Sequence, residues 1–151
     1  MKQKIGIIAA ADDEIQPLIA QMQIDKTEEA AMLKFIEGTW QEQSITAVRC
    51  GVGKVNAALA TQLLIDKQVS AVIMIGTAGA LDSNLRVGDV VIVERCTYHD
   101  VDHSGVLIHY HPYMKDLWFL SDPGLVHRAE RAASQGSEEG KIRTGRGVSG
   151  D

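Results

Sequence analysis

A buried strand that leads directly into an amphipathic helix constrains the fold of this chain more than any other feature. Residues 4–10 are almost entirely apolar, which is typical of a strand buried on both faces. The apolar residues that follow recur at the spacing of one helix face: Ile15, Leu18, Ile19 and Met22. Because strand followed by helix is the opening unit of an α/β fold, we expect a sheet with helices packed on it.

The rest of the sequence predicts an antiparallel hairpin, further helices and strands, and a last strand at the end of the chain. Residues 33–39 and 44–50 predict two strands joined by a few polar residues. Residues 99–121 show no clear period and hold four of the five histidines, which is typical of a functional excursion. We expect one α/β domain over residues 1–151, with a mixed sheet that stops on a strand and so looks cut short. Further strands are predicted at 71–75, 89–93 and 142–148, and helices at about 55–67 and 122–135.

Charge and hydropathy argue against two classes of partner. The 15 Lys and Arg against 20 Asp and Glu give a net charge of −5, so the chain has no basic field for a nucleic-acid backbone. The longest apolar stretches, residues 5–11 and 71–81, are shorter than the roughly 18 residues that a membrane helix requires. Cys50 and Cys96 lie in apolar, strand-like contexts, which favours free thiols over a disulfide. We therefore expect a cytoplasmic protein that binds neither nucleic acid nor membrane.

Three turns of small residues come directly after predicted strands, at residues 9–11, 51–53 and 76–79. In open α/β sheets, ligands bind at the carboxyl ends of the strands, where such turns allow the backbone to approach a ligand. We therefore expect the three turns to form one pocket. The first turn has no G-x-G-x-x-G pattern, and Gly53-Lys54 lacks the spacing and the following Ser or Thr of a phosphate-binding loop. The turns therefore favour neither NAD nor ATP.

Three acidic residues, Asp12, Asp13 and Glu14, open the first predicted helix. Acids are favoured at a helix N-terminus by the helix dipole, so a purely structural role accounts for them. The functional alternative is that one carboxylate lies at the end of the first strand and polarises a water. In either case, an acidic cluster at the end of the first strand disfavours binding of an anionic co-substrate such as phosphate.

The histidines raise the question of a metal site. Their spacing matches no standard zinc pattern, and a solvated or interface loop often has the same composition. We therefore expect no metal, and a metal-dependent hydrolase built on this segment stays the weaker alternative. The possible ligands in that alternative are His99, Asp102, His103 and His111.

Taken together, several short segments of the chain carry a resemblance to a known family. The segments are IGII (5–8), DEI (13–15), GVGKVNAA (51–58), GTAGAL (76–81), VGDVV (87–91), YHDVD (98–102) and VSGD (148–151). In their order, spacing and residue types they resemble the 5'-methylthioadenosine/S-adenosylhomocysteine nucleosidases, within the wider nucleoside phosphorylase superfamily. The resemblance covers nearly the whole chain and is weakest over residues 103–133.

This resemblance implies a three-layer α/β fold with a central mixed sheet flanked by helices, in a homodimer that uses no metal or cofactor. It also implies hydrolysis of the N-glycosidic bond of methylthioadenosine or S-adenosylhomocysteine, a small nucleoside, to adenine and a thioribose. The reaction develops positive charge on the ribose, so a carboxylate must orient a water while an acid protonates the purine. Glu14 matches the family's water-activating glutamate. The positions that match its nucleoside pocket are Ala10, Val52, Thr77, Ala78 and Gly79.

The resemblance also implies residues that the sequence does not contain. In the family, the chain continues past the Ser-Gly-Asp segment to purine-pocket residues, a Met-Glu pair for the ribose hydroxyls and the aspartate that protonates the purine. Asp151 belongs to Ser-Gly-Asp and does not match that acid, so we expect an N-terminal portion that is nearly inactive by itself. Two alternatives stay open: a purine nucleoside phosphorylase of the same superfamily, and a non-catalytic fragment that binds a nucleoside.

Overall fold

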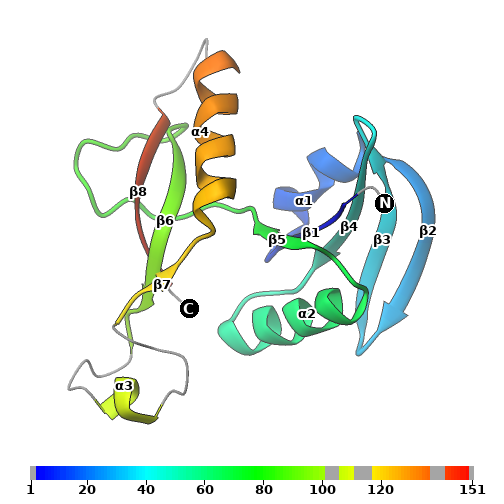
Figure 1. The fold of residues 1–151 in the computed structure, drawn as a ribbon, viewed down its shortest axis with the longest axis horizontal. Helices are drawn as coiled ribbons and strands as arrows, with labels where there is room; N and C mark the ends of the chain where they lie inside the picture. Colours follow the sequence, from blue (N-terminus) through cyan, green and yellow to red (C-terminus); the bar gives the residue numbers. More distant parts are fainter. Residues whose placement is uncertain (1–2, 101–105, 111–116, 137–141, 150–151) are drawn as a thin grey trace. The chain divides into compact units, whose positions relative to one another are not determined.

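The computed structural model describes residues 3–100, 106–110, 117–136 and 142–149, and it divides into two compact units. The first unit comprises residues 1–79 and the second comprises residues 80–150 (Figure 1). Within the described ranges, no helix is long and apolar enough to span a membrane.

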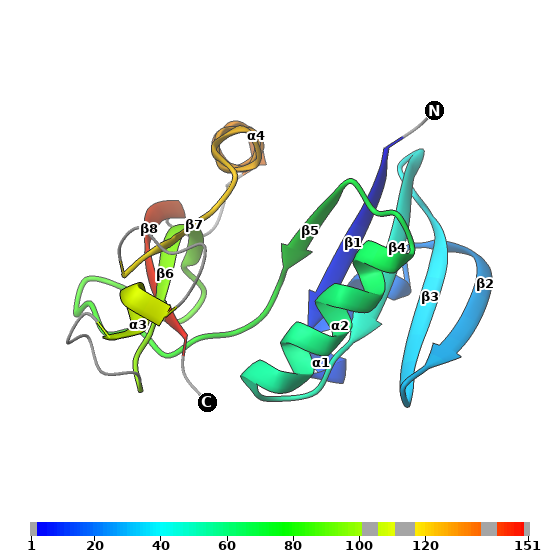
Figure 2. The same ribbon diagram turned by 60° about the horizontal axis from the view of Figure 1, so that its bottom comes forward.

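The first unit consists of β1 (Lys4–Ala9), α1 (Asp12–Ile19), β2 (Gln23–Ala30), β3 (Leu33–Trp40), β4 (Gln43–Arg49), α2 (Lys54–Asp66) and β5 (Ala71–Met74). Its five strands form one mixed sheet in the order β2-β3-β4-β1-β5. β1 is parallel to both β4 and β5, whereas β2, β3 and β4 are antiparallel neighbours. α1 and α2 pack on opposite faces of the sheet (Figure 2). The predicted hairpin and the mixed sheet with flanking helices are confirmed.

β1 is buried on both faces because a helix covers each side of the sheet. Ile7 of β1 packs with Ile15 of α1 on one face. Ile8 packs with Phe35 of β3 and Leu64 of α2 on the other face. Successive residues of a strand point to opposite faces, so a strand covered twice requires the unbroken apolar run seen in the sequence. Each large apolar side chain buried in this way stabilises the fold by roughly 1.5–3 kcal/mol.

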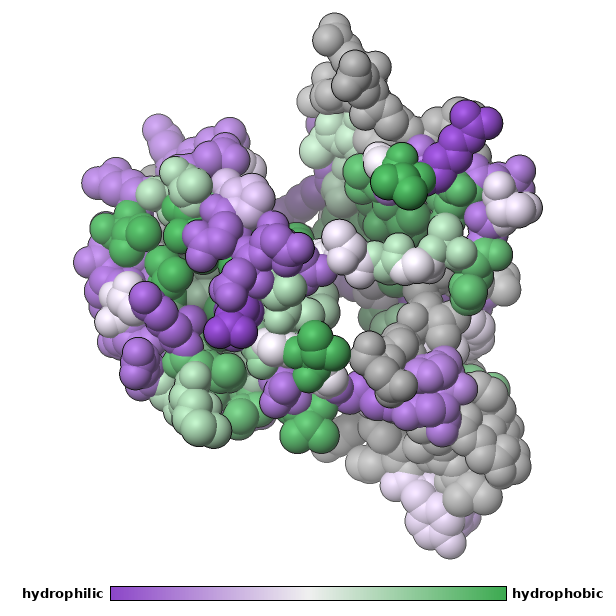
Figure 3. Space-filling model, turned by 180° about the vertical axis from the view of Figure 1, so that it is seen from behind, coloured by the Kyte–Doolittle hydropathy of each residue, from purple (hydrophilic) through white to green (hydrophobic). Residues whose placement is uncertain are grey.

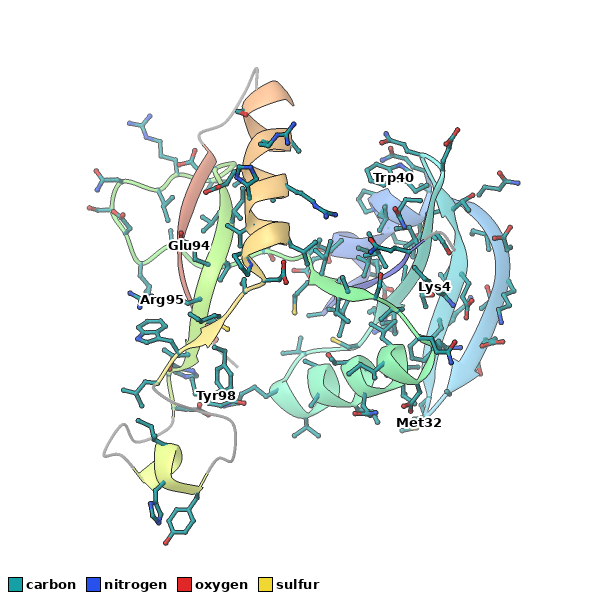
Figure 4. All side chains as sticks on the ribbon, viewed as in Figure 1. Lys4, Met32, Trp40, Glu94, Arg95 and Tyr98 are labelled. Atoms are coloured by element: carbon teal, nitrogen blue, oxygen red, sulfur yellow. The ribbon has the colours of Figure 1, made fainter. Side chains whose placement is uncertain are left out.

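The sequence patterns do not predict β2, which lies at the edge of the sheet. All but one of its residues are exposed, so this strand has no buried apolar face for a pattern to reveal. Ala31 and Met32 connect it to β3 in the left-handed conformation, with φ angles of 48° and 64°, and Figure 4 shows Met32 at this turn. Exposed charged residues along β2 protect the edge from pairing with another chain.

A network of ion pairs ties β2 to the rest of the first unit. The Glu37 carboxylate of β3 lies 2.8 Å from the Lys4 ammonium, 3.3 Å from that of Lys67 and 3.7 Å from that of Lys26. Glu28 of β2 pairs with Lys26 at 2.6 Å and also with Lys67. Lys26, followed by Lys67, lowers the pKa of Glu28 to about 2. Lys4, labelled in Figure 4, connects this network to the first strand.

α2 carries apolar side chains on its exposed side as well as on its buried side. Ala60 and Leu64 face the sheet and are fully buried. Val55 and Leu59 are exposed, and so is Val52 in the turn just before the helix. The space-filling view shows hydrophobic residues scattered among hydrophilic ones on one face of the molecule (Figure 3). A helix that only covers a sheet requires a single apolar stripe. The exposed apolar side chains of α2 are therefore not accounted for by its packing on the sheet.

The second unit consists of β6 (Val90–Tyr98), α3 (Val106–Tyr110), β7 (Phe119–Leu120), α4 (Pro123–Gly136) and β8 (Ile142–Ser149). Its sheet has the order β7-β6-β8, in which β8 is parallel to β6 and β7 is antiparallel to it. The predicted last helix and last strand are confirmed, while β6 extends beyond the predicted 89–93. Tyr98 meets Phe119 edge to face at 5.4 Å, and the Arg95 guanidinium lies 4.5 Å from the Trp118 ring centre (Figure 4).

Candidate functional site

The three small-residue turns lie at one edge of the sheet in the first unit. β4, β1 and β5 are parallel neighbours, so their carboxyl ends point to the same edge, and each is followed by one of the turns. Hydrogen bonds between main-chain groups continue past the strands, from the Cys50 N–H to the Ala9 carbonyl at 2.9 Å and from the Ile75 N–H to the Ile8 carbonyl at 3.0 Å. The turns therefore share one edge, as their positions in the sequence predict.

Glu14 is positioned first by its own helix. α1 begins at Asp12, with Ala11 as the N-cap, so Glu14 is the third residue of the helix. Its Oε2 accepts hydrogen bonds from the main-chain N–H groups of Ala10, at 3.1 Å, and Ala11, at 3.0 Å. A glutamate at this position commonly reaches back to the N-cap, where N–H groups have no partner within the helix. The start of α1 thus fixes one oxygen of the carboxylate.

The turn after β5 fixes the other oxygen. Oε1 of Glu14 accepts hydrogen bonds from the Thr77 N–H at 2.7 Å and from the Thr77 hydroxyl at 2.9 Å. Because these donors stabilise the ionised form, they lower the pKa of Glu14, with the Thr77 N–H contributing most, followed by the Thr77 hydroxyl and the Ala11 N–H. At neutral pH Glu14 is therefore a carboxylate, which can orient a water and accept its proton.

The other two acids of this helix turn have different surroundings. Asp12 pairs with Arg49 at the end of β4, where the carboxylate oxygen lies 2.9 Å from the guanidinium Nε. Asp13 is exposed to solvent. Both lie in the first turn of α1, where the helix dipole favours acids. The structural explanation therefore suffices for Asp12 and Asp13, whereas Glu14 alone is held between two turns. The sequence patterns do not predict Arg49, which pairs with Asp12 across the sheet edge.

The remaining predicted site residues line the same edge. Ala10 donates its main-chain N–H to Glu14. Val52 lies in the turn after β4, is 67% exposed, and offers its carbonyl to the Asn56 side chain at 2.8 Å. Ala78 and Gly79 follow Thr77 and are exposed. Their contacts with a nucleoside stay predictions.

The histidine segment lies in the second unit, and most of it falls outside the described residues. Asp102, His103 and His111 are among the residues that the structure does not describe. His99 Nδ1 lies 4.0 Å from a carboxylate oxygen of Asp100. Among the described residues, no group of three or more His, Cys, Asp or Glu side chains is arranged to hold a metal ion. Cys50 and Cys96 are both free thiols, as predicted.

Comparison with known sequences places these features in a family. The model of the phosphorylase superfamily matches residues 4–151. The 5'-methylthioadenosine/S-adenosylhomocysteine nucleosidase of Shewanella oneidensis is 38% identical over 148 residues, which cover 94% of this chain and 63% of the relative. The nucleosidase of the same name from Staphylococcus carnosus is 40% identical over 97% of this chain and 64% of its own length. The chain thus spans slightly less than two thirds of these relatives.

Solved structures show the same similarity. The nucleosidase of Neisseria meningitidis in complex with methylthio-immucillin-A matches with a TM-score of 0.88 and 34% identity, over 99% of this chain and 65% of the other. That of Colwellia psychrerythraea in complex with adenine matches with a TM-score of 0.89 and 34% identity, over 100% and 63%. Futalosine hydrolase of Helicobacter pylori matches with a TM-score of 0.84 at 25% identity. These findings confirm the fold class and the resemblance on which it rests, and the chain belongs to the phosphorylase superfamily.

Proposed function

We propose that this protein hydrolyses the N-glycosidic bond of 5'-methylthioadenosine or S-adenosylhomocysteine and releases adenine and a thioribose. The observation that carries the proposal is the Glu14 carboxylate, held ionised at the sheet edge where α/β folds bind their ligands. Similarity to nucleosidases supports the substrate class, and one of the similar structures is in complex with adenine.

In the proposed reaction Glu14 acts as the general base. Departure of the purine builds positive charge on the ribose, and a water must then add to the anomeric carbon. Glu14 orients this water and takes its proton, while neighbouring positions hold the nucleoside. By resemblance, Val52 lines the ribose and alkylthio pocket, Thr77 lies near the sugar, and Ala78 and Gly79 run along the purine.

The electrostatics of the edge favour water over phosphate as the attacking group. A phosphorylase requires cationic groups for its anionic co-substrate. The charge of Arg49, a cation at this edge, is already paired with Asp12. Turnover that needs no phosphate would therefore distinguish the hydrolase from the phosphorylase alternative.

The proposal is tested by adenine release from methylthioadenosine in phosphate-free buffer. The 151-residue chain is compared with a version extended through the downstream reading frame, and Glu14→Gln and Asp13→Asn are made in the extended form. We expect release by the extended form that Glu14→Gln lowers on the order of 10²- to 10⁴-fold, since general base catalysis contributes about this much. Asp13→Asn is the matched control, an exposed acid beside Glu14, and should change the rate little.

Two outcomes of this experiment contradict the proposal. If no form releases adenine although circular dichroism shows it folded, the non-catalytic nucleoside-binding alternative is favoured. If release requires phosphate, the protein is a phosphorylase.

We further propose that the protein is a cytoplasmic homodimer in which both units belong to one nucleosidase domain. The free thiols of Cys50 and Cys96 support a reducing compartment. The exposed apolar side chains of Val55 and Leu59 on α2 support burial against a second copy. Val55→Asp should therefore shift the mass measured by light scattering from dimer to monomer.

The matched control for this variant is Gln62→Asp, which adds the same charge on an exposed position of α2. A wild-type protein that is monomeric at tens of micromolar, or a Val55→Asp variant that stays dimeric, would contradict the proposed interface.

A further inference from the structure

The hydrogen bonds of Glu14 leave no acceptor site unused. A carboxylate offers about four lone-pair sites, two on each oxygen. Oε2 accepts from the N–H groups of Ala10 and Ala11, and Oε1 accepts from the N–H and the hydroxyl of Thr77. A water that is to be oriented and deprotonated by Glu14 must therefore displace one of these donors.

Only one of the four donors can give way without rearranging the backbone. The N–H groups of Ala10 and Ala11 are fixed by the link from β1 to α1, and that of Thr77 is fixed by the turn after β5. The Thr77 hydroxyl, in contrast, rotates about a single bond and can both donate and accept a hydrogen bond. It can thus turn from Glu14 to the incoming water at small cost.

The space beside the carboxylate is narrow at Gly76. A Cβ atom placed on Gly76 would lie 3.0 Å from Oε1 of Glu14, 3.3 Å from Cδ and 3.4 Å from Oε2. Contacts of 3.0–3.4 Å are tighter than nearly all real Cβ contacts, so an alanine here would push the carboxylate away. The φ angle of Gly76 lies outside the left-handed region, so only the space, and not the backbone conformation, calls for glycine.

Resting on the proposed function, we propose that Gly76 and Thr77 are positioning residues for Glu14. Gly76 leaves the space that lets the carboxylate lie against the end of β5. The Thr77 hydroxyl occupies the acceptor site on Oε1 that the attacking water takes over during turnover. The N-terminus of α1 and the turn after β5 then fix the carboxylate from both sides, while the acceptor site on Oε1 can exchange the Thr77 hydroxyl for the water.

The role of Thr77 is tested by the pH profile of kcat/KM for adenine release by the extended form. Thr77→Ala removes a donor that lowers the pKa of Glu14, so the acidic limb should move to higher pH and the loss of rate should be largest at acidic pH. Thr77→Ser keeps the hydroxyl and should return the limb toward its wild-type position. Thr61→Ala, which removes a hydroxyl bonded to the Ala57 carbonyl within α2, is the control and should leave the limb in place.

The role of Gly76 is tested by Gly76→Ala. The displacement is a few tenths of an ångström, less than the ~1 Å that costs on the order of 10²-fold in rate, so we expect kcat/KM to fall by roughly threefold to tenfold. The amide signals of Ala10, Ala11 and Thr77 in a ¹H–¹⁵N spectrum should move together, because they share the displaced carboxylate. If these three signals keep their positions, or kcat/KM stays within a factor of two of wild type, the role of Gly76 is refuted.

A titration of the Glu14 carboxyl carbon by NMR separates this inference from the proposed function, because it needs no turnover. The signal is assigned by its loss in Glu14→Gln. A midpoint that rises in Thr77→Ala and returns in Thr77→Ser supports the positioning role even where no adenine is released, in which case only the proposed function fails. A midpoint that is the same in wild type and Thr77→Ala overturns the positioning role of Thr77, whatever the activity.

Discussion

Replacing Glu37 with Gln should destabilise the first unit by about 2 kcal/mol at pH 7. The Glu37 side chain is only 13% exposed, and its carboxylate lies 2.8 Å from Lys4 and 3.3 Å from Lys67. Glutamine keeps the shape but loses the charge, and its NH₂ group would face an ammonium. Because a hydrogen bond to a charged group contributes about 1.5–3 kcal/mol, loss of one such contact sets the expected size. An exposed ion pair would contribute at most about 1 kcal/mol.

The stability difference between wild type and Glu37→Gln should decrease as the pH falls. Burial acts to raise the pKa of Glu37, but the hydrogen bonds from Lys4 and Lys67 outweigh it, and the pKa is lowered from the ordinary 4.5. A carboxyl whose pKa falls on folding stabilises the protein above its unfolded pKa, and this contribution disappears as the pH drops through the folded pKa. The difference between wild type and Glu37→Gln should therefore be complete at pH 7 and shrink as the pH falls below 4.5.

Urea denaturation followed by circular dichroism, at pH 7 and at several values below 4.5, measures the loss of stability and its dependence on pH. Glu29→Gln, which removes an exposed carboxylate of β2, is the matched control and should change the free energy of unfolding by less than about 0.5 kcal/mol. An equal loss in Glu29→Gln and Glu37→Gln would refute this explanation, since the exposed carboxylate and the largely buried one would then contribute equally to stability. A difference that grows as the pH falls would refute the sign of the linkage.

Three further predictions address other parts of the first unit and the proposed chemistry. Gly38→Ala should destabilise the chain by roughly 1–3 kcal/mol in urea denaturation, because a Cβ there would lie 2.1 Å from the Gln23 carbonyl oxygen of β2. Cys50 should react with iodoacetamide far more slowly in the folded than in the urea-unfolded chain, as measured by mass spectrometry, because burial raises the pKa of its thiol. Dialysis against EDTA should leave adenine release unchanged; a loss restored by zinc would favour the metal-dependent alternative.

The parts of the fold that the sequence predicts are those whose pattern follows from burial. The run at residues 4–10 is apolar throughout because α1 and α2 cover both faces of β1. Met22 belongs to the same apolar pattern as Ile15 and is buried with it, although α1 ends at Ile19, before Met22. The pattern therefore reports which side chains are buried more faithfully than where the helix ends. β2 shows the converse, since a strand with an exposed, charged surface has no such pattern.

The candidate site was predictable as an edge of the sheet but not as a set of contacts. Parallel strands followed by small residues imply where a ligand binds. The hydrogen bonds between Glu14 and Thr77 join residues 63 positions apart, and no local spacing encodes them. The pairing of Asp12 with Arg49 likewise depends on β1 and β4 being neighbours. Such contacts follow from the sheet order, which the sequence patterns leave undetermined.

The geometry also explains why a glutamate, and not one of the adjacent aspartates, is held in this way. Oε2 must reach back to the N–H groups before the helix while Oε1 meets Thr77 on the neighbouring strand end. An aspartate at the same position is one methylene shorter and cannot span both. The helix cap and the ionised carboxylate are therefore one arrangement, so any change that shortens this side chain weakens folding and chemistry together. Gln at position 14 keeps the length and can cap the helix through its carbonyl oxygen, but its NH₂ group cannot accept a hydrogen bond from the Thr77 N–H.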